Sequence, residues 1–371
     1  MSREKIYRVA VDARPLTSPM SGVARVISEV LTHFPDRKSF YFELHANRPF
    51  HADFKQLLAM PHVEWVQGEG SLSSRAGLWY NLKLPFAIRK NPPDLFWGSQ
   101  QVIPPMLPRG LPVVLTCYDY VLHFYPETMR PMARWQQRMV LEMSLGRAAR
   151  TLSISDQTRR DTVETFGYPA ERARTALLGY RPPPLPDAET RDQLQGELAM
   201  RLGFRPRDNY ILAVSTIEPR KNYGILIEAY IRYYRRMGLR AFPLVIAGRR
   251  GWESQEFYDT LAAYQRESGK IYTLEGLSDR HLTELYRSCA FFAMPSLYEG
   301  FGLPLLEALC HGRQALASNI PCFHEIGGEF VRYLPADDPA RWTQALESAT
   351  RLMQGRKKPK QNFSPREWNW N

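Results

Sequence analysis

Short apolar runs alternate with stretches of helical periodicity on both sides of a proline-rich segment, and this alternation constrains the fold more than any other feature. In the first half of the chain, strands are predicted at 7–11, 40–45, 63–66, 95–97, 112–117 and 151–155. In the second half they are predicted at 210–217, 242–248, 271–276, 290–296 and 314–319. Strands that alternate with helices form parallel sheets with right-handed crossover connections. The expected fold class is therefore α/β, with two doubly wound, Rossmann-like domains facing across a cleft.

Four prolines, Pro182, Pro183, Pro184 and Pro186, mark the best domain boundary. Proline fixes its own φ angle and restricts the residue before it, so this segment is predicted to be an extended connector. We expect an N-terminal domain over residues 1–180, a linker and entry helix over 181–204, and a C-terminal domain over 205–371. The end of the chain has two interpretations, a short crossover back onto the N-terminal domain or a truncation.

Charge and cysteine content bear on partners and location. The formal net charge is +11, which is typical of proteins that bind nucleic acid or an anionic membrane surface. The four cysteines show neither a C-x-x-C pair nor zinc-ligand spacing. The N-terminus lacks the apolar region of a secretion signal, and no apolar stretch approaches the length of a membrane span. These features favour a cytoplasmic protein.

Two adjacent cations, Arg220 and Lys221, follow the apolar strand at 210–217. The loop after such a strand faces the crevice at the carboxyl ends of a parallel sheet, where these sheets bind ligands. Arginine offers a planar fork and lysine a mobile point charge, so the pair suits a diphosphate. Taken alone, two solvated loop cations are the better interpretation.

The segment SLYEGFGLPLLEAL places Glu299 in a glycine-rich loop and Glu307 in the helix that follows. Gly300 and Gly302 allow a close approach of the backbone to a ligand, and the helix N-terminus offers unpaired N–H groups to an anion. A carboxylate is a natural acceptor for vicinal hydroxyls, so the two glutamates could grip two sugar rings, one on each side of a diphosphate. Either glutamate taken singly is more simply a helix-cap acid or a solvated acid.

Together, ILAVSTIEPRKNYGILIEAY, LVIAGRRGW and SLYEGFGLPLLEAL closely resemble the retaining glycosyltransferases of family 4, which have the two-domain GT-B fold. Glu299 and Glu307 match the E-x7-E motif of that family. In the first half, VDARPLTSPMSGVARV resembles the loop before the first helix, and LTCYDYVLHFYPETM resembles the His-Asp segment. The resemblance implies a metal-independent hexosyltransferase that needs no cofactor and uses a nucleotide sugar as substrate.

The resemblance also implies roles for individual residues. Arg220 and Lys221 would bind the pyrophosphate of the donor, Glu307 the ribose hydroxyls, and Glu299 the hydroxyls of the transferred sugar. The remaining donor-site residues would be Gly22, Ser215, Gly248, Trp252, Ser296, Leu297, Gly300, Phe301, Gly302 and Leu303. Tyr118 replaces the His of the His-Asp pair and precedes Asp119, and Ser215 stands where glycine is usual. A front-face mechanism, with the leaving phosphate taking the acceptor proton, is expected, and Glu299 is not assigned as a nucleophile.

Similar motifs are frequent among bacterial mannosyltransferases of O-antigen, lipopolysaccharide and exopolysaccharide synthesis, which implies GDP-mannose as donor and a lipid-linked or polysaccharide acceptor. Most of the positive charge lies in the first 180 residues. We therefore expect peripheral attachment to the inner face of the plasma membrane rather than nucleic-acid binding. The residues proposed to meet anionic headgroups are Lys83, Arg89, Lys90, Arg130, Arg134, Arg138, Arg147 and Arg150, with Trp79, Tyr80 and Phe86 nearby. Solvated helix faces are the simpler interpretation of each cation alone.

Three alternatives remain open. The basicity permits a nucleic-acid-binding protein, although no zinc-finger or RNA-recognition signature occurs. The same fold serves other nucleotide-sugar enzymes, with another donor or with epimerase activity. A catalytically silent assembly partner is the third alternative, suggested by Tyr118 and Ser215.

Overall fold

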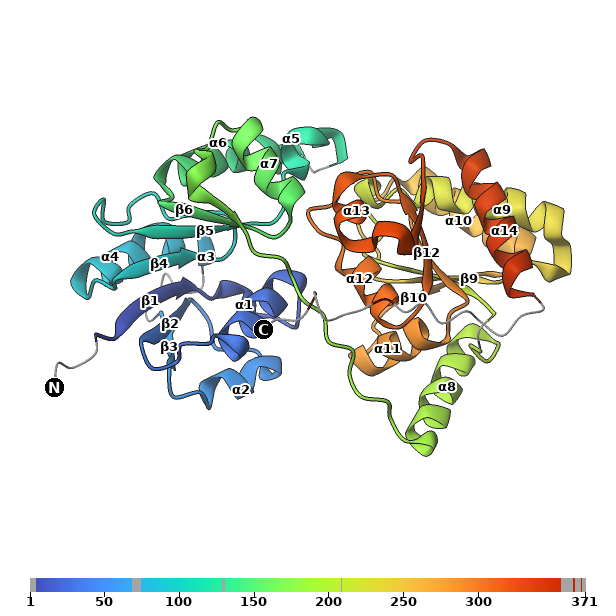
Figure 1. The fold of residues 1–371 in the computed structure, drawn as a ribbon, viewed down its shortest axis with the longest axis horizontal. Helices are drawn as coiled ribbons and strands as arrows, with labels where there is room; N and C mark the ends of the chain where they lie inside the picture. Colours follow the sequence, from blue (N-terminus) through green and yellow to red (C-terminus); the bar gives the residue numbers. More distant parts are fainter. Residues whose placement is uncertain are drawn as a thin grey trace. The chain divides into compact units, whose positions relative to one another are not determined.

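The computed structural model describes residues 5–68, 75–128, 131–207, 209–354, 363 and 368, with the side chains of 128 and 131–138 excepted. These residues form two compact units (Figure 1). Unit 1 contains residues up to His123 and from Arg130 to Gly179, and unit 2 contains Phe124–Met129 and the chain from Tyr180 to Asn369. The expected return of the last residues to the N-terminal domain lies outside the described residues. Within the described residues, no helix combines the length and apolar character needed to span a bilayer.

Unit 1 is built on a seven-stranded sheet of order β3-β2-β1-β4-β5-β6-β7, in which every pair of neighbours is parallel. Its strands are β1 Tyr7–Asp12, β2 Phe40–Ala46, β3 Val63–Gln67, β4 Leu95–Gly98, β5 Val113–Cys117, β6 Arg150–Ser153 and β7 Ala173–Thr175. Its helices are α1 Gly22–His33, α2 Lys55–Leu58, α3 Ala76–Leu78, α4 Leu84–Lys90, α5 Val121–Phe124, α6 Pro131–Arg147 and α7 Asp156–Glu164. A π-helical turn, Trp79–Lys83, joins α3 to α4.

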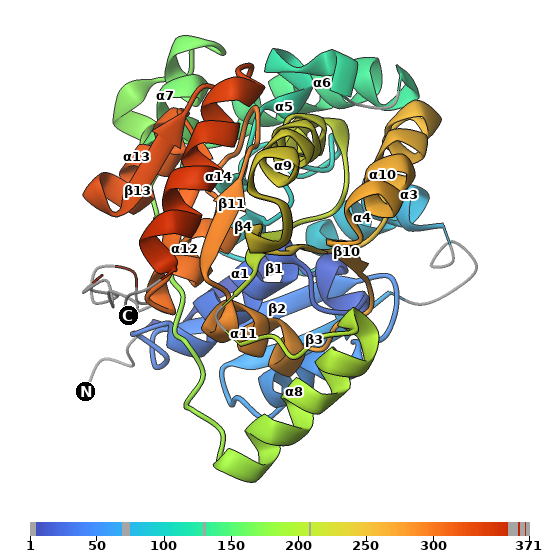
Figure 2. The same ribbon diagram turned by 90° about the vertical axis from the view of Figure 1, so that its right-hand side faces the viewer.

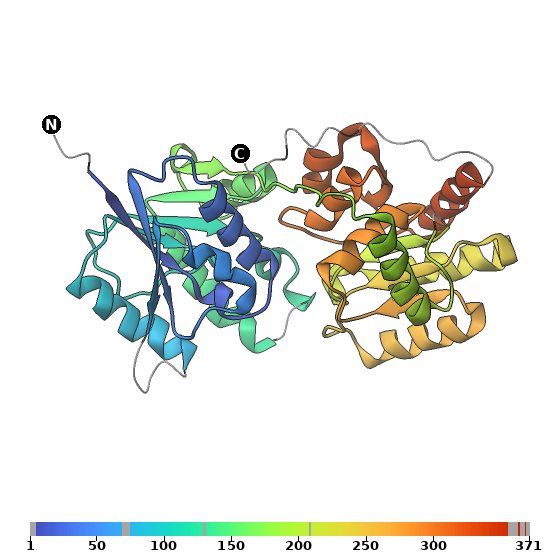
Figure 3. The ribbon, with the colours of Figure 1, turned by 90° about the horizontal axis from the view of Figure 1, so that it is seen from below.

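Two apolar cores cover the two faces of this sheet. On one face Val9 and Val11 of β1 pack in a core with Ile27 and Leu31 of α1, and α2 closes the same core. On the other face Ala10 belongs to a core that contains residues of α4 and α6. The alternation of Val9, Ala10 and Val11 between the cores is the two-residue period of a strand buried on both faces. Figure 3 shows α1 and α2, in blue, on their side of the sheet.

Unit 2 is built on a six-stranded parallel sheet of order β10-β9-β8-β11-β12-β13. Its strands are β8 Ile211–Val214, β9 Leu244–Ala247, β10 Ile271–Leu274, β11 Phe291–Met294, β12 Gln314–Ser318 and β13 Val331–Leu334. Its helices are α8 Ala188–Leu202, α9 Tyr223–Met237, α10 Gln255–Ser268, α11 Asp279–Ser288, α12 Leu303–Cys310, α13 Pro321–Gly327 and α14 Pro339–Met353. Helices α9 and α14 lie side by side on one face, where Tyr230 and Trp342 are fully buried (Figure 2). The expected α/β class with two doubly wound sheets is confirmed.

Candidate active site

The loop after β8 holds the two predicted cations in a defined geometry. Pro219–Lys221 form a single 3-10 turn, and Asn222 ends it in the left-handed region at φ 55°. The Asn222 side chain donates to the carbonyls of Pro295, at 3.1 Å, and Ala336, at 2.7 Å. Asparagine tolerates the left-handed region better than most residues because its short amide can bond to nearby backbone. The turn therefore fixes Arg220 and Lys221 against the loop that follows β11.

That second loop places Glu299 directly against both cations. Arg220 Nη1 lies 2.8 Å from Glu299 Oε2, and Lys221 Nζ lies 2.5 Å from Glu299 Oε1. The Ser296 hydroxyl also donates to Oε1, at 2.8 Å. The backbone N–H of Leu297 donates to the carbonyl of Arg220 at 2.8 Å, so the two loops are joined through main chain as well as side chains. The structure thus brings together five of the predicted site residues.

The electrostatic balance of this cluster keeps Glu299 ionised. Burial opposes the charged form, but Lys221 and Arg220 outweigh it and lower the pKa of Glu299 to about 2. A carboxylate with that pKa neither donates nor takes up a proton near neutral pH. A carboxylate has four lone-pair positions, two on each oxygen. Lys221 and Ser296 occupy both positions on Oε1, and Arg220 occupies one on Oε2, so Oε2 has room for one further donor. Glu299 can therefore accept a hydrogen bond from a ligand hydroxyl.

Arg220 has a second acidic partner that sequence reasoning missed. Its Nε lies 2.7 Å from Glu218 Oε1, and Glu218 is itself buried. The pair holds the guanidinium plane from one side while Glu299 and the carbonyl of Tyr298 bond to Nη1. The available signal was Glu218 itself, an acid two residues before the predicted cation in a loop that follows a buried strand, because a buried charge requires a partner.

Gly302 controls how the glycine-rich loop enters α12. Its φ of +109° lies in a region that side-chain-bearing residues rarely adopt, and a Cβ would lie 2.7 Å from Phe323 Cε1. The preceding Gly300 and Phe301 are buried, and Leu303 begins the helix. Glu307 lies on the same helix, with 7% of its surface exposed. The loop therefore keeps the single backbone path that places Glu299 before α12 and Glu307 within it.

Two other predicted residues meet at the ends of neighbouring strands. A Cβ on Gly248, after β9, would lie 1.8 Å from the carbonyl oxygen of Ser215, after β8, so only glycine fits there. The hydroxyl of Ser215 lies 2.9 Å from that of Tyr223. The serine that replaces the expected glycine thus bonds to α9. Trp252 lies in the loop after Gly248 with 36% of its surface exposed.

The predicted residues of unit 1 lie at the carboxyl ends of its own strands. Gly22 is the first residue of α1, whose N-cap Ser21 accepts from the N–H of Ala24. The Gln101 amide oxygen accepts from the N–H groups of Tyr118, at 3.0 Å, and Asp119, at 3.4 Å. Among the described residues the buried Tyr118 hydroxyl has no hydrogen-bond partner, and burial together with the charge of Asp12 raises its pKa.

Sequence reasoning missed a buried ion pair beside Tyr118. Asp12, at the end of β1, is fully buried and accepts from Arg14 Nε and Nη2, both at 2.8 Å, and from Gln100 at 3.0 Å. Arg14 in turn lies over the ring of Tyr80, 3.4 Å from its centroid. The signal was Asp12 itself, a charged residue inside the apolar run of the first strand, because unpaired charges are not buried.

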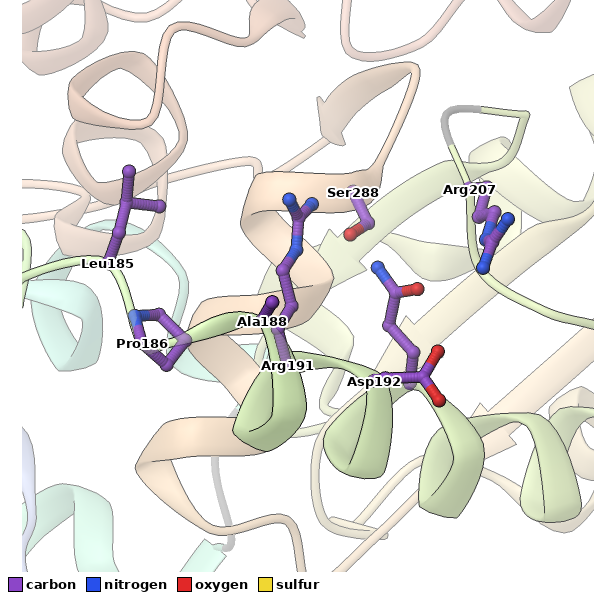
Figure 4. A pocket seen from close by; sticks show the side chains of 8 residues that line it. Leu185, Pro186, Ala188, Arg191, Asp192, Arg207 and Ser288 are labelled. Carbon is purple, nitrogen blue, oxygen red and sulfur yellow. The ribbon is translucent and has the colours of Figure 1, made fainter.

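Unit 2 also contains an open cavity of about 550 Å³. It lies between the proline-rich segment, α8 and the end of α11, and Pro186, Arg191, Asp192 and Ser288 line it (Figure 4). Three of the residues around it, Arg191, Gln195 and Ser288, donate to Glu284. None of the predicted site residues lines this cavity.

Two family sequence models match the chain, one for each half. The family described as Glycosyltransferase Family 4 matches residues 20–179, and the one described as Glycosyl transferases group 1 matches residues 196–365. Together they cover nearly all of both units. The chain thus contains a Glycosyltransferase Family 4 domain followed by a Glycosyl transferases group 1 domain. The solved structures place this chain in the GT-B fold. The Anabaena protein HepE in complex with UDP-glucose aligns with a TM-score of 0.66 at 18% identity over 94% of this chain and 91% of that one. WaaG, a glycosyltransferase involved in lipopolysaccharide biosynthesis, aligns with a TM-score of 0.68 at 14% identity over 93% and 90%.

Curated relatives of this chain include several mannosyltransferases. The O-antigen chain mannosyltransferase B of Escherichia coli is 32% identical over 66% of this chain and 62% of its own length. The O-antigen chain mannosyltransferase RfbU of Salmonella typhimurium is 23% identical over 64% and 61%. An MMP alpha-(1->4)-mannosyltransferase of Mycolicibacterium hassiacum is 41% identical over 62% and 54%. The matched part spans less than two thirds of each relative.

Proposed function

We propose that this protein is a retaining glycosyltransferase that moves mannose from GDP-mannose to a hydroxyl of a lipid-linked or polysaccharide acceptor. The observation that carries the proposal is the contact of Arg220 and Lys221 with Glu299 where two neighbouring parallel strands end. A sugar joined to a diphosphate is recognised by cations that bind the phosphates and, beside them, a carboxylate that accepts hydrogen bonds from the sugar hydroxyls. The names of three relatives support mannose as the sugar.

In the proposed reaction the cations act on charge that develops during the step. As the bond between the sugar and the diphosphate breaks, the sugar becomes oxocarbenium-like and negative charge grows on the leaving phosphate. Arg220 and Lys221 would stabilise that charge, and they are already oriented by Glu218 and Glu299. We infer that this fixed positive charge makes a metal ion unnecessary.

Glu299 would hold the transferred sugar rather than react with it. Its low pKa and its three hydrogen-bond donors leave it a weak nucleophile, so a covalent glycosyl-enzyme is disfavoured. We infer a front-face displacement in which the leaving phosphate oxygen takes the proton of the acceptor hydroxyl. The acceptor oxygen then bonds to the anomeric carbon on the face that the phosphate leaves, and the anomeric configuration is retained.

The donor is tested by thermal shift with a panel of GDP-mannose, UDP-glucose, UDP-galactose and dTDP-rhamnose. A donor present at about 100 times its Kd adds about 2.7 kcal/mol of stability, which is a clear rise in Tm. We expect GDP-mannose to give the largest rise and Arg220→Ala to remove it. A larger rise with a UDP-sugar would overturn the donor assignment, and no rise with any donor would favour the silent assembly partner.

We also propose that unit 1 binds an anionic membrane surface, on a smaller surface than the sequence suggests. The structure corrects the residue set: Trp79 and Tyr80 are buried, and Arg147 donates to the carbonyls of Pro108 and Leu111. Arg150 donates to the carbonyl of Glu171. The side chains of Arg130, Arg134 and Arg138 lie outside the described residues.

The surface that remains is formed by one helical segment, residues 76–90. Leu78, Leu82 and Phe86, spaced four residues apart, are 39%, 47% and 70% exposed. Arg75, Lys83 and Lys90 flank them, together with Arg89, which also donates to the Met106 carbonyl at 3.3 Å. The sequence from 75 to 93 contains no acidic residue. Apolar side chains among cations suit the interface of an anionic bilayer.

Liposome co-sedimentation tests this surface. We expect Phe86→Asp to reduce binding to vesicles that contain phosphatidylglycerol, and Met200→Asp, a change of an even more exposed apolar residue on α8, to leave it unchanged. Equal binding of wild type and Phe86→Asp at low salt would refute the membrane surface, while leaving the transferase proposal standing.

A further inference from the structure

Glu307 lies close to a buried aromatic residue to which the sequence analysis assigned no role. Tyr286 on α11 is 1% exposed, and burial together with the nearby Glu307 carboxylate raises the pKa of its hydroxyl well above the ordinary value. The hydroxyl therefore remains protonated, and is a hydrogen-bond donor, at any working pH. Among the described residues it has no partner of ordinary hydrogen-bond geometry, although Glu307 is the acid that faces it.

His311 holds the ring of Tyr286 from the other side. The two rings are stacked, with centroids 5.8 Å apart and planes at 17°. His311 follows Glu307 by four residues, and its backbone N–H donates to the Glu307 carbonyl at 3.1 Å at the end of α12. Residues four apart lie on one face of a helix, so the acid and the imidazole both face Tyr286. The ring of Tyr286 is thereby fixed relative to the helix that carries Glu307.

Tyr180 fixes His311 in turn. The hydroxyl of Tyr180 lies 3.0 Å from His311 Nε2. Burial, with the positive charges of Arg287 and Arg313, lowers the pKa of His311 to about 3, so its imidazole is neutral and Nε2 can accept from Tyr180. Tyr180 is the residue at which the chain enters unit 2, and its own N–H donates to the carbonyl of Trp368 at 2.8 Å.

We propose that Tyr286 is a positioning residue for Glu307, with His311 and Tyr180 as its support. The Tyr286 hydroxyl donates to one Glu307 oxygen and leaves the other directed at a hydroxyl of the donor's ribose. Hydrogen bonds that are loose without ligand can tighten in the complex, and the Tyr286 hydroxyl, which has no other partner among the described residues, is available to do so. This inference rests on the proposed function, in which Glu307 binds the ribose of a nucleotide sugar.

The experiment measures binding of nucleoside diphosphates with and without ribose hydroxyls. The Kd values of GDP, UDP and ADP and of their 2′,3′-dideoxy forms are measured by calorimetry, so the result does not depend on the base. For Tyr286→Phe, which keeps the ring, we expect the ribonucleotide Kd to rise about 10-fold and the dideoxy Kd to stay within about 2-fold. In turnover, the KM for the donor should rise while kcat changes little, as expected for lost uniform binding.

Two further variants test the supporting contacts. Tyr180→Phe removes only the hydroxyl that reaches His311, and we expect a smaller loss, about 3-fold, again confined to the ribonucleotide. Tyr272→Phe is the matched control: it removes a tyrosine hydroxyl that bonds to the Gly269 carbonyl in the same unit, and should change neither Kd.

The outcomes separate this inference from the proposed function. If Glu307→Gln loses the preference for ribose and Tyr286→Phe keeps it, the positioning role is refuted and the ribose assignment stands. If Tyr286→Phe weakens ribo and dideoxy forms equally, Tyr286 is only structural and the inference fails. If Glu307→Gln keeps the full preference for ribose, or no nucleotide binds, the proposed function itself fails.

Discussion

Replacing Glu299 with glutamine should make the protein bind free GDP more tightly, although it should abolish transfer. In the structure, the Glu299 carboxylate is 2.8 Å from Arg220 Nη1 and 2.5 Å from Lys221 Nζ, so it neutralises the cations proposed to hold the diphosphate. A phosphate oxygen on the far side of the same cations would lie about 5–6 Å from the carboxylate, given hydrogen bonds of about 2.8 Å. Glutamine preserves the size of the side chain and removes its charge.

The expected magnitude follows from this separation. Two unit charges about 5–6 Å apart repel by about 3 kcal/mol at an effective dielectric constant of about 20. Some of that gain is lost because the uncharged amide orients the cations less firmly. We therefore expect Glu299→Gln to lower the Kd of GDP by about 10-fold to 100-fold.

Isothermal titration of wild type and Glu299→Gln with GDP at neutral pH measures the change. Transfer by the variant should fall by about 10²-fold or more, because the sugar loses its charged hydroxyl acceptor. Glu347→Gln is the control: it removes an acid that pairs with Arg236 in the last turn of α9, at the other end of that helix from Lys221, and should leave the Kd of GDP unchanged. If Glu299→Gln binds GDP with unchanged or lower affinity, then Arg220 and Lys221 do not bind the diphosphate while they remain paired with Glu299.

Three further outcomes concern stability and pH. Gly302→Ala should lower the free energy of unfolding, measured by chemical denaturation, by about 1–3 kcal/mol, because φ is +109° and there is no space for a Cβ. The control Gly276→Ala, at φ +63° with open space for a Cβ, should lower it by about 1 kcal/mol. Asp12→Asn should cost about 3–5 kcal/mol, because it removes the fully buried carboxylate that neutralises the partly buried Arg14. A loss below 1 kcal/mol, as expected for the exposed Asp192→Asn, would contradict this ion pair. Because the pKa of Glu299 is lowered to about 2, its contribution to stability is fully present above about pH 4.5 and is lost as pH falls toward 2. The difference in unfolding free energy between wild type and Glu299→Gln should therefore be constant from pH 6 to 8 and shrink below pH 4, and kcat should show no acidic limb from this carboxylate.

Most of the fold could be predicted because its central strands are continuous apolar runs. β8, β9 and β11 are buried along their lengths and stand out between helical stretches. β7 and β13 were not predicted, since they are short edge strands with exposed residues, and nothing in their composition separates them from loops. Their pairing is decided by neighbours that lie elsewhere in the sequence.

The candidate site was predictable in its residues and not in its contacts. The spacing of Arg220, Lys221 and Glu299 after two strands indicated a diphosphate site, but no spacing could show that the carboxylate bonds to both cations. Tyr286 is 21 residues before Glu307 on another helix, so their contact depends on how α11 and α12 pack. Trp79 and Tyr80 were expected near the membrane surface, but both are buried in the apolar core of unit 1.

The order of the strands in unit 2 explains why chemistry collects between β8 and β11. From β8 the chain proceeds outward through β9 to β10, and it then returns to the other side of β8 to form β11, β12 and β13. The connections after β8 and β11 therefore leave the sheet toward opposite faces, and a crevice opens at this reversal of winding direction. The strands on either side are registered by residues that take no part in the ion cluster. Selection can consequently alter those side chains of the loops at 215–221 and 295–302 that lie outside the core, and with them the donor, while core residues such as Ile217 and the packing of the strands stay unchanged.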